Sequence, residues 1–267
     1  MRDGFHGGPL RGTDPILIEV EDLVTHYGDM LVIDRVSCAV RRGEIFVVIG
    51  GSGCGKTTLL RHMTGLLRPT SGSIRYEGVD ITKLDEEDLA EVQHSIGIAF
   101  QSSGLFNSMT VGENVALPLR EYGNVDKELI DAIVRFKLSL VGLADAVDLM
   151  PEELSGGMRK RAGLARAIAL DPPVVFFDEP SAGLDPIMAA GLDDLILELN
   201  NLLGITFVIV THELDSIRKV ADSILMLDRG KAIFYGALTE AEQSDMPRVR
   251  QFFERRADEF IMQRNIE

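Results

Sequence analysis

The sequence contains few cysteines and no long hydrophobic run. Two cysteines, Cys38 and Cys54, are too few for a framework of disulfide bonds, which fits a reducing compartment such as the cytosol. The longest apolar runs, IFVVIG and VVFF, are much shorter than the roughly 18–20 residues that a membrane-spanning helix needs. Residues 1–15 are rich in glycine and lack the apolar core of a signal peptide, so we expect a flexible tail there.

Basic residues are also scarce relative to acidic ones. The chain of 267 residues has 27 Lys and Arg against 42 Asp and Glu, a formal net charge of −15. A protein that binds duplex nucleic acid normally carries a basic face, so we expect no nucleic-acid partner. The charge balance does not exclude a nucleotide, because a binding site is local whereas net charge is global.

The hydrophobic residues that are present fall into short continuous runs. Three of them occupy residues 45–49, 174–177 and 207–210. Continuous runs of Val, Ile and Phe are typical of strands buried on both faces of a parallel sheet. Helical patterns follow at 57–66 and at 187–203, and Gly204 is placed to end the second helix. This alternation of strand and helix predicts an α/β fold.

Other segments depart from this alternation. ILIEVEDLVTHYG (16–28) and SIRYEGVDIT (73–82) partly alternate, as antiparallel strands do. ILMLDRGKAIFYG (224–236) is typical of a hairpin that turns at residues 228–230. Residues 102–169 have few strand signals, so we expect an α-helical subdomain inserted into the sheet.

The C-terminal residues 237–267 form a predicted helical extension. Within it, apolar residues recur at helical spacing, with charged residues largely filling the gaps. The apolar positions are Val249, Phe252, Phe253, Ala257, Phe260 and Ile261. This stripe packs either on its own domain or on a second chain.

The stretch GGSGCGKTT has the spacing of a phosphate-binding loop. It follows the strand IFVVI and precedes a helix, which is the context that the motif requires. Its glycines allow backbone N–H groups to face phosphate oxygens, Lys56 can reach the β- and γ-phosphates, and Thr57 suits a Mg²⁺ ligand. The predicted ATP-binding residues here are Gly50, Gly51, Ser52, Gly53, Cys54, Gly55, Lys56, Thr57 and Thr58. Cys54 occupies a variable position of this loop and is read as a space-filling residue; the alternative is that the surrounding N–H groups lower the pKa of its thiol.

Acidic residues end the next buried strand, in VVFFDEP. Asp178 is placed to hold Mg²⁺, and Glu179 to orient or deprotonate the attacking water. Together with the phosphate loop, this pair predicts a hydrolase.

Two further polar residues follow apolar strands. His212, in TFVIVTHE, is expected to contact the γ-phosphate and to sense its presence. Gln101, in IGIAFQSSGLF, is a candidate contact for Mg²⁺ or for the attacking water. We therefore assign Glu179, His212 and Gln101 as candidate catalytic residues, and Thr57, Gln101 and Asp178 as candidate metal ligands.

A second glycine-rich turn, LSGGM, precedes another predicted helix. It comprises Ser155, Gly156, Gly157 and Met158, and three basic residues follow at 159–161. Free N–H groups, the positive end of a helix dipole and nearby basic side chains predict a second phosphate socket.

The ordered set GGSGCGKTT, Gln101, LSGGM, VVFFDEP, SAGLD and His212 resembles the nucleotide-binding subunit of an ATP-binding cassette (ABC) transporter, over roughly residues 16–236. The resemblance implies a RecA-like P-loop NTPase core with a mixed sheet, an antiparallel β subdomain and the inserted helical subdomain. A P-loop kinase or a small GTPase would leave LSGGM unexplained.

The resemblance also explains the second socket. In such proteins the signature loop LSGGM of one copy closes on the ATP that the P-loop of another copy holds, so we expect a homodimer around two ATP molecules. It implies that Ser155, Gly156 and Gly157 contact the γ-phosphate in trans, that Tyr27 stacks on adenine, and that Asp185 signals between the two sites. Met158 stands where many cassettes carry Gln. Gln101 and residues 102–119 would receive a coupling helix of a membrane permease.

Two segments, LSGGMRKRAGLARAIALDP and FQSSGLFNSMTVGENVALPLRE, are similar to the ATPase of bacterial phospholipid-trafficking systems of the Mla type. That similarity implies phospholipid transport between the inner and outer membranes, with a permease, an MCE-domain lipid-binding subunit and a STAS-domain subunit as partners. It places the chain on the cytoplasmic face of the inner membrane. The alternatives are a small-solute ABC importer and, more remotely, a non-transport ABC ATPase.

Overall fold

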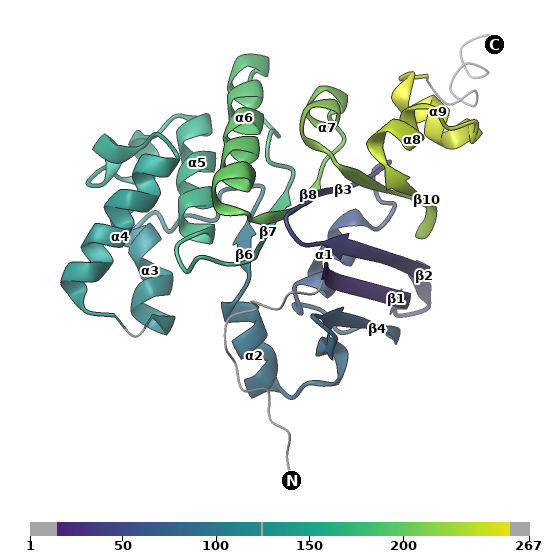
Figure 1. The fold of residues 1–267 in the computed structure, drawn as a ribbon, viewed down its shortest axis with the longest axis horizontal. Helices are drawn as coiled ribbons and strands as arrows, with labels where there is room; N and C mark the ends of the chain where they lie inside the picture. The colour runs from purple at the N-terminus through teal and green to yellow at the C-terminus, as the bar shows by residue number, and fades with distance from the viewer. Residues whose placement is uncertain (1–14, 124, 257–267) are drawn as a thin grey trace.

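The computed structural model describes residues 15–123 and 125–256, and a mixed sheet of six strands forms the centre of this part of the chain (Figure 1). Its strand order is β10-β9-β3-β8-β7-β6, and only the pair β9–β10 is antiparallel. The strands are β3 (Ile45–Gly50), β6 (Gly97–Ala99), β7 (Val174–Asp178), β8 (Thr206–Val210), β9 (Ser223–Asp228) and β10 (Lys231–Ala237). The predicted α/β fold, its three buried strands and the hairpin at 228–230 are confirmed.

A second sheet is antiparallel and has the order β2-β1-β4-β5. Its strands are β1 (Ile16–Tyr27), β2 (Met30–Arg41), β4 (Ser71–Tyr76) and β5 (Val79–Asp80). The two segments that the sequence marks as antiparallel both lie in this sheet.

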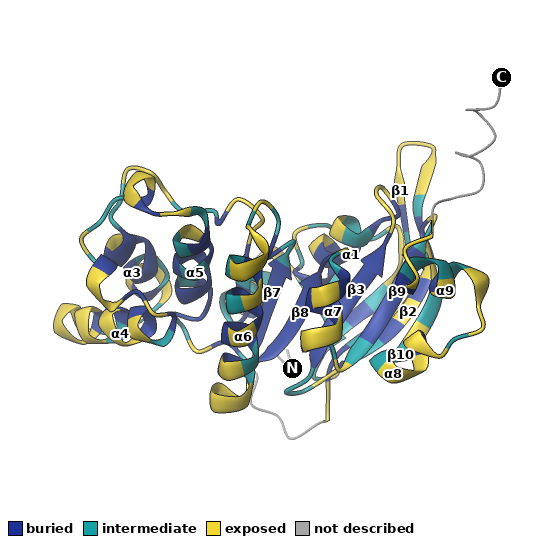
Figure 2. Ribbon diagram, turned by 90° about the horizontal axis from the view of Figure 1, so that it is seen from above, coloured by how far each residue is buried: buried dark blue, intermediate teal, exposed yellow. Residues whose placement is uncertain are grey.

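Strand β3 shows how the layers are arranged. Its residues Ile45, Val47 and Ile49 belong to one buried cluster, which extends into the helices, while Phe46 and Val48 belong to another. The second cluster contains the antiparallel sheet and helix α1 (Lys56–Met63). The central sheet is therefore covered on both faces, and its strands β3, β7 and β8 are almost wholly buried (Figure 2).

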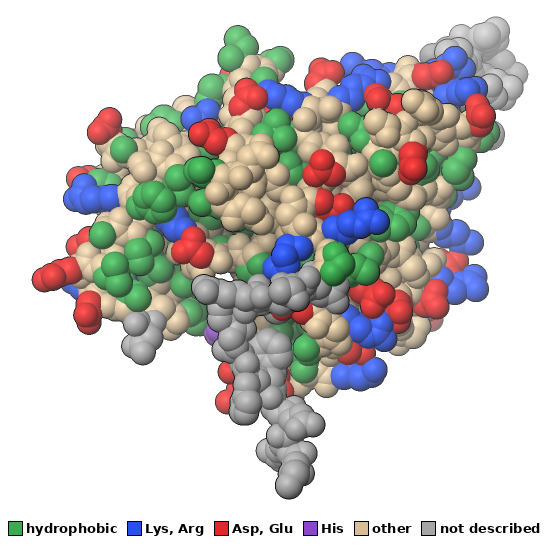
Figure 3. Space-filling view, viewed as in Figure 1, with side chains coloured by type: hydrophobic (Ala, Val, Ile, Leu, Met, Phe, Trp, Pro, Cys, Tyr) green, Lys and Arg blue, Asp and Glu red, His purple; other side chains and the backbone are tan. Residues whose placement is uncertain are grey.

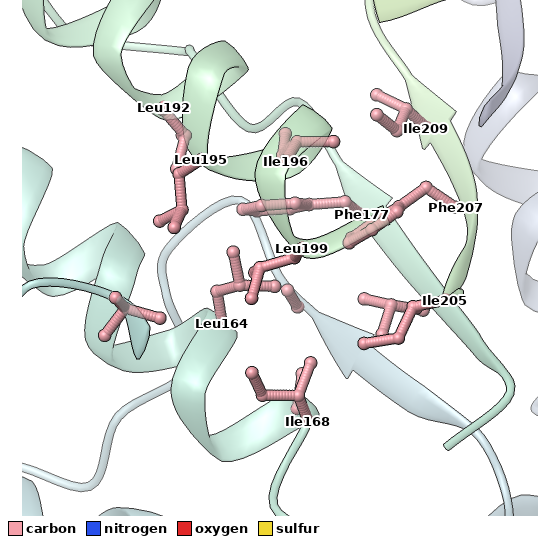
Figure 4. Close-up of a cluster of buried hydrophobic side chains, with 14 of the residues drawn as sticks. Leu164, Ile168, Phe177, Leu192, Leu195, Ile196, Leu199, Ile205, Phe207 and Ile209 are labelled. Carbon is pink, nitrogen blue, oxygen red and sulfur yellow. The ribbon is translucent and has the colours of Figure 1, made fainter. Parts of the chain in front are cut away.

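Helices cover the first cluster. They are α3 (Val111–Tyr122), α4 (Lys127–Leu140), α5 (Gly156–Ala167), α6 (Pro186–Leu203) and α7 (Leu214–Val220), while α2 (Glu86–His94) lies beside the second cluster. Ile196 and Leu199 of α6 lie next to Phe177 of β7, and Leu164 of α5 lies beside Leu199 (Figure 4). This packing fixes α5 and α6 against the strands whose ends carry the polar residues.

The described residues between β6 and β7 contain helices and loops but no strand, as predicted for the inserted region. Helices α3, α4 and α5 lie together on one side of the molecule (Figure 1). Helix α3 begins with a capping box in which Thr110 and Glu113 each accept a hydrogen bond from the other's backbone. On the face seen in Figure 3, hydrophobic side chains gather over these helices, and basic and acidic side chains are mixed elsewhere.

Two predicted helix ends have different outcomes. Helix α6 ends at Leu203, and Gly204 follows with a left-handed φ of 67°, as predicted. Helix α1 ends at Met63 and not at Leu66, because Gly65 adopts a φ of 69° and donates its N–H back to the carbonyl of His62.

The C-terminal extension packs partly on its own chain. Helices α8 (Leu238–Glu242) and α9 (Pro247–Phe253) follow β10, and Val249 and Phe253 are buried in the first cluster. The apolar positions Ala257, Phe260 and Ile261 lie outside the described residues, as do residues 1–14 of the predicted tail. The domain boundary after residue 236 stays a prediction. Within the described part, none of the helices combines the length and apolar character that crossing a membrane requires.

Candidate nucleotide-binding and catalytic site

The candidate residues meet at one edge of the central sheet. Val210 of β8 is level with Val48 of β3 and with Asp178 of β7, so the loops after these parallel strands leave side by side. Strand β8 lies between β3 and β7, so the two strands that precede the phosphate loop and the carboxylates are not neighbours. Asp178 nevertheless reaches the loop, since the Thr57 hydroxyl is close enough to oppose the rise in the pKa of its carboxyl.

The phosphate loop depends on glycine at positions where a side chain would collide. A Cβ at Gly50, whose φ is 144°, would lie 2.2 Å from the carbonyl oxygen of Leu227. Gly55 precedes α1 with a φ of 109° and supplies no side-chain cap, so the first N–H groups of the helix stay open. Ser52, Gly53 and Thr57 are exposed on the loop, which fits a surface that receives phosphate oxygens.

Lys56 braces this loop from within. Its Nζ donates to the carbonyl oxygens of Gly50 at 2.9 Å and Gly51 at 3.0 Å. The ammonium therefore lies over the concave side of the loop, where β- and γ-phosphates are expected. Gly51 is exposed and Thr58 is half-buried.

Cys54 is a space-filling residue, and the alternative that its thiol has a lowered pKa is wrong. Its side chain is 5% exposed and belongs to the cluster beneath the antiparallel sheet. Burial raises the pKa of the Cys54 thiol, and this outweighs the opposing effect of the nearby Lys56 charge. Cys54 therefore contributes backbone to the loop, while its side chain packs in the core.

We accordingly expect both cysteines to react slowly in the native protein. Burial raises the pKa of the Cys38 thiol to about 12, from an ordinary value of 9.0. This rise lowers the thiolate fraction at pH 8 by about a thousandfold. The alkylation rate falls with it, because only the thiolate reacts. Iodoacetamide labelling followed by mass spectrometry should show little adduct at either cysteine before denaturation and two adducts after it. Fast native labelling of Cys54 would contradict this reading.

Asp178 is a buried carboxylate with an open oxygen. Burial raises its pKa, the neighbouring charge of Glu179 raises it further, and Arg61 and Lys56 oppose the shift. Its Oδ1 is buried without a hydrogen-bond partner. An orphaned carboxylate oxygen beside a threonine hydroxyl matches the oxygen ligands that Mg²⁺ takes.

Glu179 is held in an unusual backbone conformation. Its φ is 48°, in the left-handed region that costs a residue with a side chain about 1–2 kcal/mol. Its N–H donates to the carbonyl of Val210 at 2.8 Å. Its Oε1 accepts from, or shares a proton with, Nδ1 of His212 at 2.9 Å, and its Oε2 is buried without a partner. The structure thus brings Glu179 and His212 together, as their strand-end positions predicted.

Gln101 lies in a cleft with Asp178. The cleft, of about 520 Å³, is lined by Phe100, Gln101, Ser102, Asp178, Ala182 and Gly183. The exposed Gln101 side chain is therefore on the same side of the sheet as the carboxylates.

Tyr27, at the end of β1, is 44% exposed. Its role with adenine stays a prediction.

The turn LSGGM begins helix α5. Ser155 is exposed and caps the helix by accepting from the N–H of Met158 at 3.2 Å. Gly156 has room, since an added Cβ would meet only Leu184 at 3.5 Å, whereas at Gly157 it would lie 2.1 Å from Met188. Among the residues described, no hydrogen bond joins 155–158 to the phosphate loop at 50–58.

The basic run after this turn does not face a phosphate in the way we expected. Arg159 donates to the carbonyl of Leu154 at 2.6 Å. Lys160 is 6% exposed, and its Nζ donates to the carbonyls of Gln101 at 2.6 Å and Glu179 at 3.1 Å. Two of the three basic side chains are thus bonded within their own chain. Asp185 likewise caps its own helix α6, through the N–H groups of residues 187 and 188 at 3.0 Å.

Sequence reasoning did not predict the buried positions of three polar residues. They are Lys160, Asn114, whose side chain holds the backbone of residues 106–110, and Ser181, whose hydroxyl is buried without a partner beside the carboxylates. Ser181 lies two residues after Glu179 in the motif, and that spacing was the one usable signal. Lys160 and Asn114 are recognisable only from the tertiary structure.

A parallel sheet with a glycine-rich loop after one strand, and a carboxylate pair after another, defines a P-loop NTPase. Residues 33–182 match the family described as "ABC transporter". The chain belongs to the ABC transporter family, as one of its ATP-binding and ATP-hydrolysing subunits.

Relatives with similar sequences carry two different descriptions. The chain is 42% identical over 242 residues to the "Intermembrane phospholipid transport system ATP-binding protein MlaF" of Haemophilus influenzae, covering 91% of this chain and 92% of that one. It is also 42% identical over 246 residues to the "Probable ribonucleotide transport ATP-binding protein mkl" of Mycobacterium leprae, covering 92% of this chain and 71% of that one.

Solved structures show the same fold. CbiO1 of Clostridium perfringens, part of the ABC transporter complex cbiONQ, matches with a TM-score of 0.81 and 28% identity, covering 90% of this chain and 100% of that one. The bacterial ABC transporter cassette MJ0796, solved as a dimer, matches with a TM-score of 0.76 and 29% identity, covering 83% of this chain and 99% of that one.

Proposed function

We propose that this chain powers an ABC transporter that moves phospholipid between the inner and outer membranes of a bacterium. The observation that carries the proposal is the 42% identity to MlaF, which extends over 91% of this chain and 92% of that relative. Small-solute transport is the second candidate, because a relative described as a probable ribonucleotide transport ATP-binding protein has the same 42% sequence identity to this chain.

Within the site, we assign the reaction steps to residues at the sheet edge. Lys56 and the open N–H groups of α1 bind the phosphates. Glu179 takes a proton from the attacking water, and His212, hydrogen-bonded to Glu179 Oε1, orients that carboxylate and contacts the γ-phosphate. The geometry supports this because the four groups leave neighbouring strands at one level.

A divalent cation fits the same edge. The Thr57 hydroxyl is close enough to Asp178 to affect the pKa of its carboxyl, Asp178 Oδ1 has no partner, and Gln101 lines the adjoining cleft. These three residues would hold Mg²⁺, which supplies charge neutralisation for the phosphate oxygens. Asp178 and Gln101 then position the cation relative to the loop.

The signature turn acts on a second copy of the chain. Ser155 and Gly156 lie at the open start of α5, and no hydrogen bond in the described chain joins them to its own phosphate loop. A start of this kind binds anions. We propose that two copies enclose two ATP molecules, with Asp185 near the seam, and the dimeric MJ0796 cassette supports this arrangement.

Mixing two inactive variants tests the shared site. Gly156→Asp puts a carboxylate at the signature turn with little packing cost, and Lys56→Ala disables the phosphate loop. Each variant alone should lose nearly all ATPase activity, whereas an equal mixture should recover a clear fraction, because mixed dimers hold one intact site. If Gly156→Asp alone is fully active, each chain carries a complete site and the shared site is wrong.

A groove supports the docking of a permease. A cleft of about 510 Å³ lies between the helical segment and the sheet, and its exposed apolar side chains are Leu66, Phe100, Phe106 and Tyr122. Gly104, Phe106, Leu117 and Pro118 line this cleft and belong to the segment 102–119 that we expect to receive a coupling helix, whereas Gln101 lines a different cleft. Docking there would place the chain on the cytoplasmic face of the inner membrane.

Purification of the native complex tests the transported substrate. Phospholipid bound to a complex that contains a permease, an MCE-domain subunit and a STAS-domain subunit would support phospholipid transport. A periplasmic solute-binding protein in the complex, with no bound lipid, would instead support small-solute import.

A further inference from the structure

Lys160 is a buried charge at the centre of the site. Its ammonium lies 2.6 Å from the carbonyl oxygen of Gln101 and 3.1 Å from that of Glu179, and the side chain belongs to helix α5. Burial lowers its pKa, and the charges of Glu179 and Asp178 oppose that shift. A buried ammonium is stable only where acceptors replace the water that it loses, and here both acceptors are backbone carbonyls of site residues.

Two hydrogen bonds, one on each side of Glu179, hold its backbone in the left-handed conformation. Val210 accepts the N–H of Glu179, and Lys160 donates to its carbonyl, so the residue is held on both sides. A strained residue of this kind persists only while its surroundings hold it. Without the ammonium, Glu179 can relax to a negative φ, and its carboxylate would then leave His212.

The same face of α5 also holds the segment after Gln101. Three residues at a spacing of three contact it: Lys160, Gly163 and Arg166. A Cβ at Gly163 would lie 2.8 Å from the carbonyl oxygen of Ser103, and Arg166 donates to the carbonyl of Gly104 at 2.6 Å. Residues 101–104 therefore follow α5 as one unit, and Lys160 is the member that also reaches Glu179.

We propose that Lys160 is a positioning residue for ATP hydrolysis, which fixes the backbones of Gln101 and Glu179 to one point on the signature helix. The proposal rests on the assignment of Glu179 as the base. Lys160 donates to two backbone carbonyls, and we assign it no role in binding the nucleotide. Its effect is to hold the backbones of Glu179 and Gln101 at fixed positions relative to helix α5, whose first turn is proposed to act on the other copy.

Steady-state kinetics of two variants test this role. Lys160→Met keeps the length of the side chain and removes the donor, so kcat should fall about ten- to a hundredfold, the cost of misplacing a catalytic group by about 1 Å. KM for ATP should change by less than about threefold, since nucleotide binding does not use Lys160. Lys160→Arg retains N–H donors and should recover most of the lost kcat.

Lys137 provides a matched control. It is also buried, at 2% exposure, and is ion-paired with Asp171 away from the site. Lys137→Met should lower the melting temperature while leaving kcat near the wild-type value. A kcat loss that is equal in both Met variants would reduce Lys160 to a general structural role and overturn the proposal.

Hydrogen exchange gives a second readout without nucleotide. In Lys160→Met, peptides that contain residues 101–104 and 178–182 should exchange faster than in wild type, and Lys137→Met should leave both unchanged. Wild-type exchange and wild-type kcat in Lys160→Met would overturn this inference alone. A wild-type chain that does not hydrolyse ATP would overturn the proposed function, and this inference with it.

Discussion

Replacing Glu179 with glutamine is expected to lower kcat for ATP hydrolysis by at least about a hundredfold, the usual contribution of a general base. Glutamine has nearly the same shape, and its amide oxygen can still accept a hydrogen bond from His212 at the position of Oε1. What it loses is the ability to take a proton from water. Nucleotide affinity should therefore stay within a few-fold of wild type.

The same variant should accumulate as a closed pair. If two copies enclose two ATP molecules, a chain that binds ATP without cleaving it keeps the γ-phosphate links between the copies. Gel filtration with ATP and Mg²⁺ should show a dimer for Glu179→Gln and mainly monomer for wild type after hydrolysis. Asp194→Asn, at an exposed position on α6, is the matched carboxylate control and should behave as wild type. A Glu179→Gln chain with normal kcat would remove Glu179 as the base.

Much of this site could be predicted because its chemistry depends on local motifs. Strands β3, β7 and β8 are recognisable as continuous apolar runs, and the residues after them have few structural uses other than ligand binding. Parallel strands bring their carboxyl ends to one edge, so Lys56, Glu179 and His212 converge without any further assumption. The order of the strands, with β8 in the middle, does not follow from such runs.

The errors share a physical cause, which is the direction of a side chain. Lys160 lies in a basic run that the pattern assigned to a phosphate socket, and the alternative for Cys54 placed its thiol among the N–H groups of the phosphate loop, yet both side chains are buried. Whether a side chain points outwards depends on contacts from distant elements, such as β2 for the phosphate loop and the backbone of residues 101 and 179 for α5. Local spacing carries no information about those contacts.

Replacing Lys56 with alanine is expected to have the other large effect, a loss of about 10²–10³-fold or more in kcat/KM, the range seen when one charge-stabilising donor is removed. The loss has two sources. The ammonium no longer pairs with the phosphates, and the carbonyls of Gly50 and Gly51 lose the donor that braces the loop. Equilibrium binding of a fluorescent ATP analogue should therefore weaken together with catalysis, which separates this variant from Glu179→Gln.

A second substitution separates the loss of the positive charge from the loss of the hydrogen bonds that brace the loop. Lys56→Arg keeps a positive charge, but its planar guanidinium cannot reproduce the geometry in which a compact ammonium donates to the carbonyls of both Gly50 and Gly51. We expect it to recover nucleotide binding partly and catalysis hardly at all. Lys83→Ala, an exposed lysine paired with Asp80, is the control for loss of one positive charge and should be neutral. If Lys56→Ala bound ATP as tightly as wild type, the loop would not be the nucleotide site, and the convergence of the three strand ends would need another ligand to explain it.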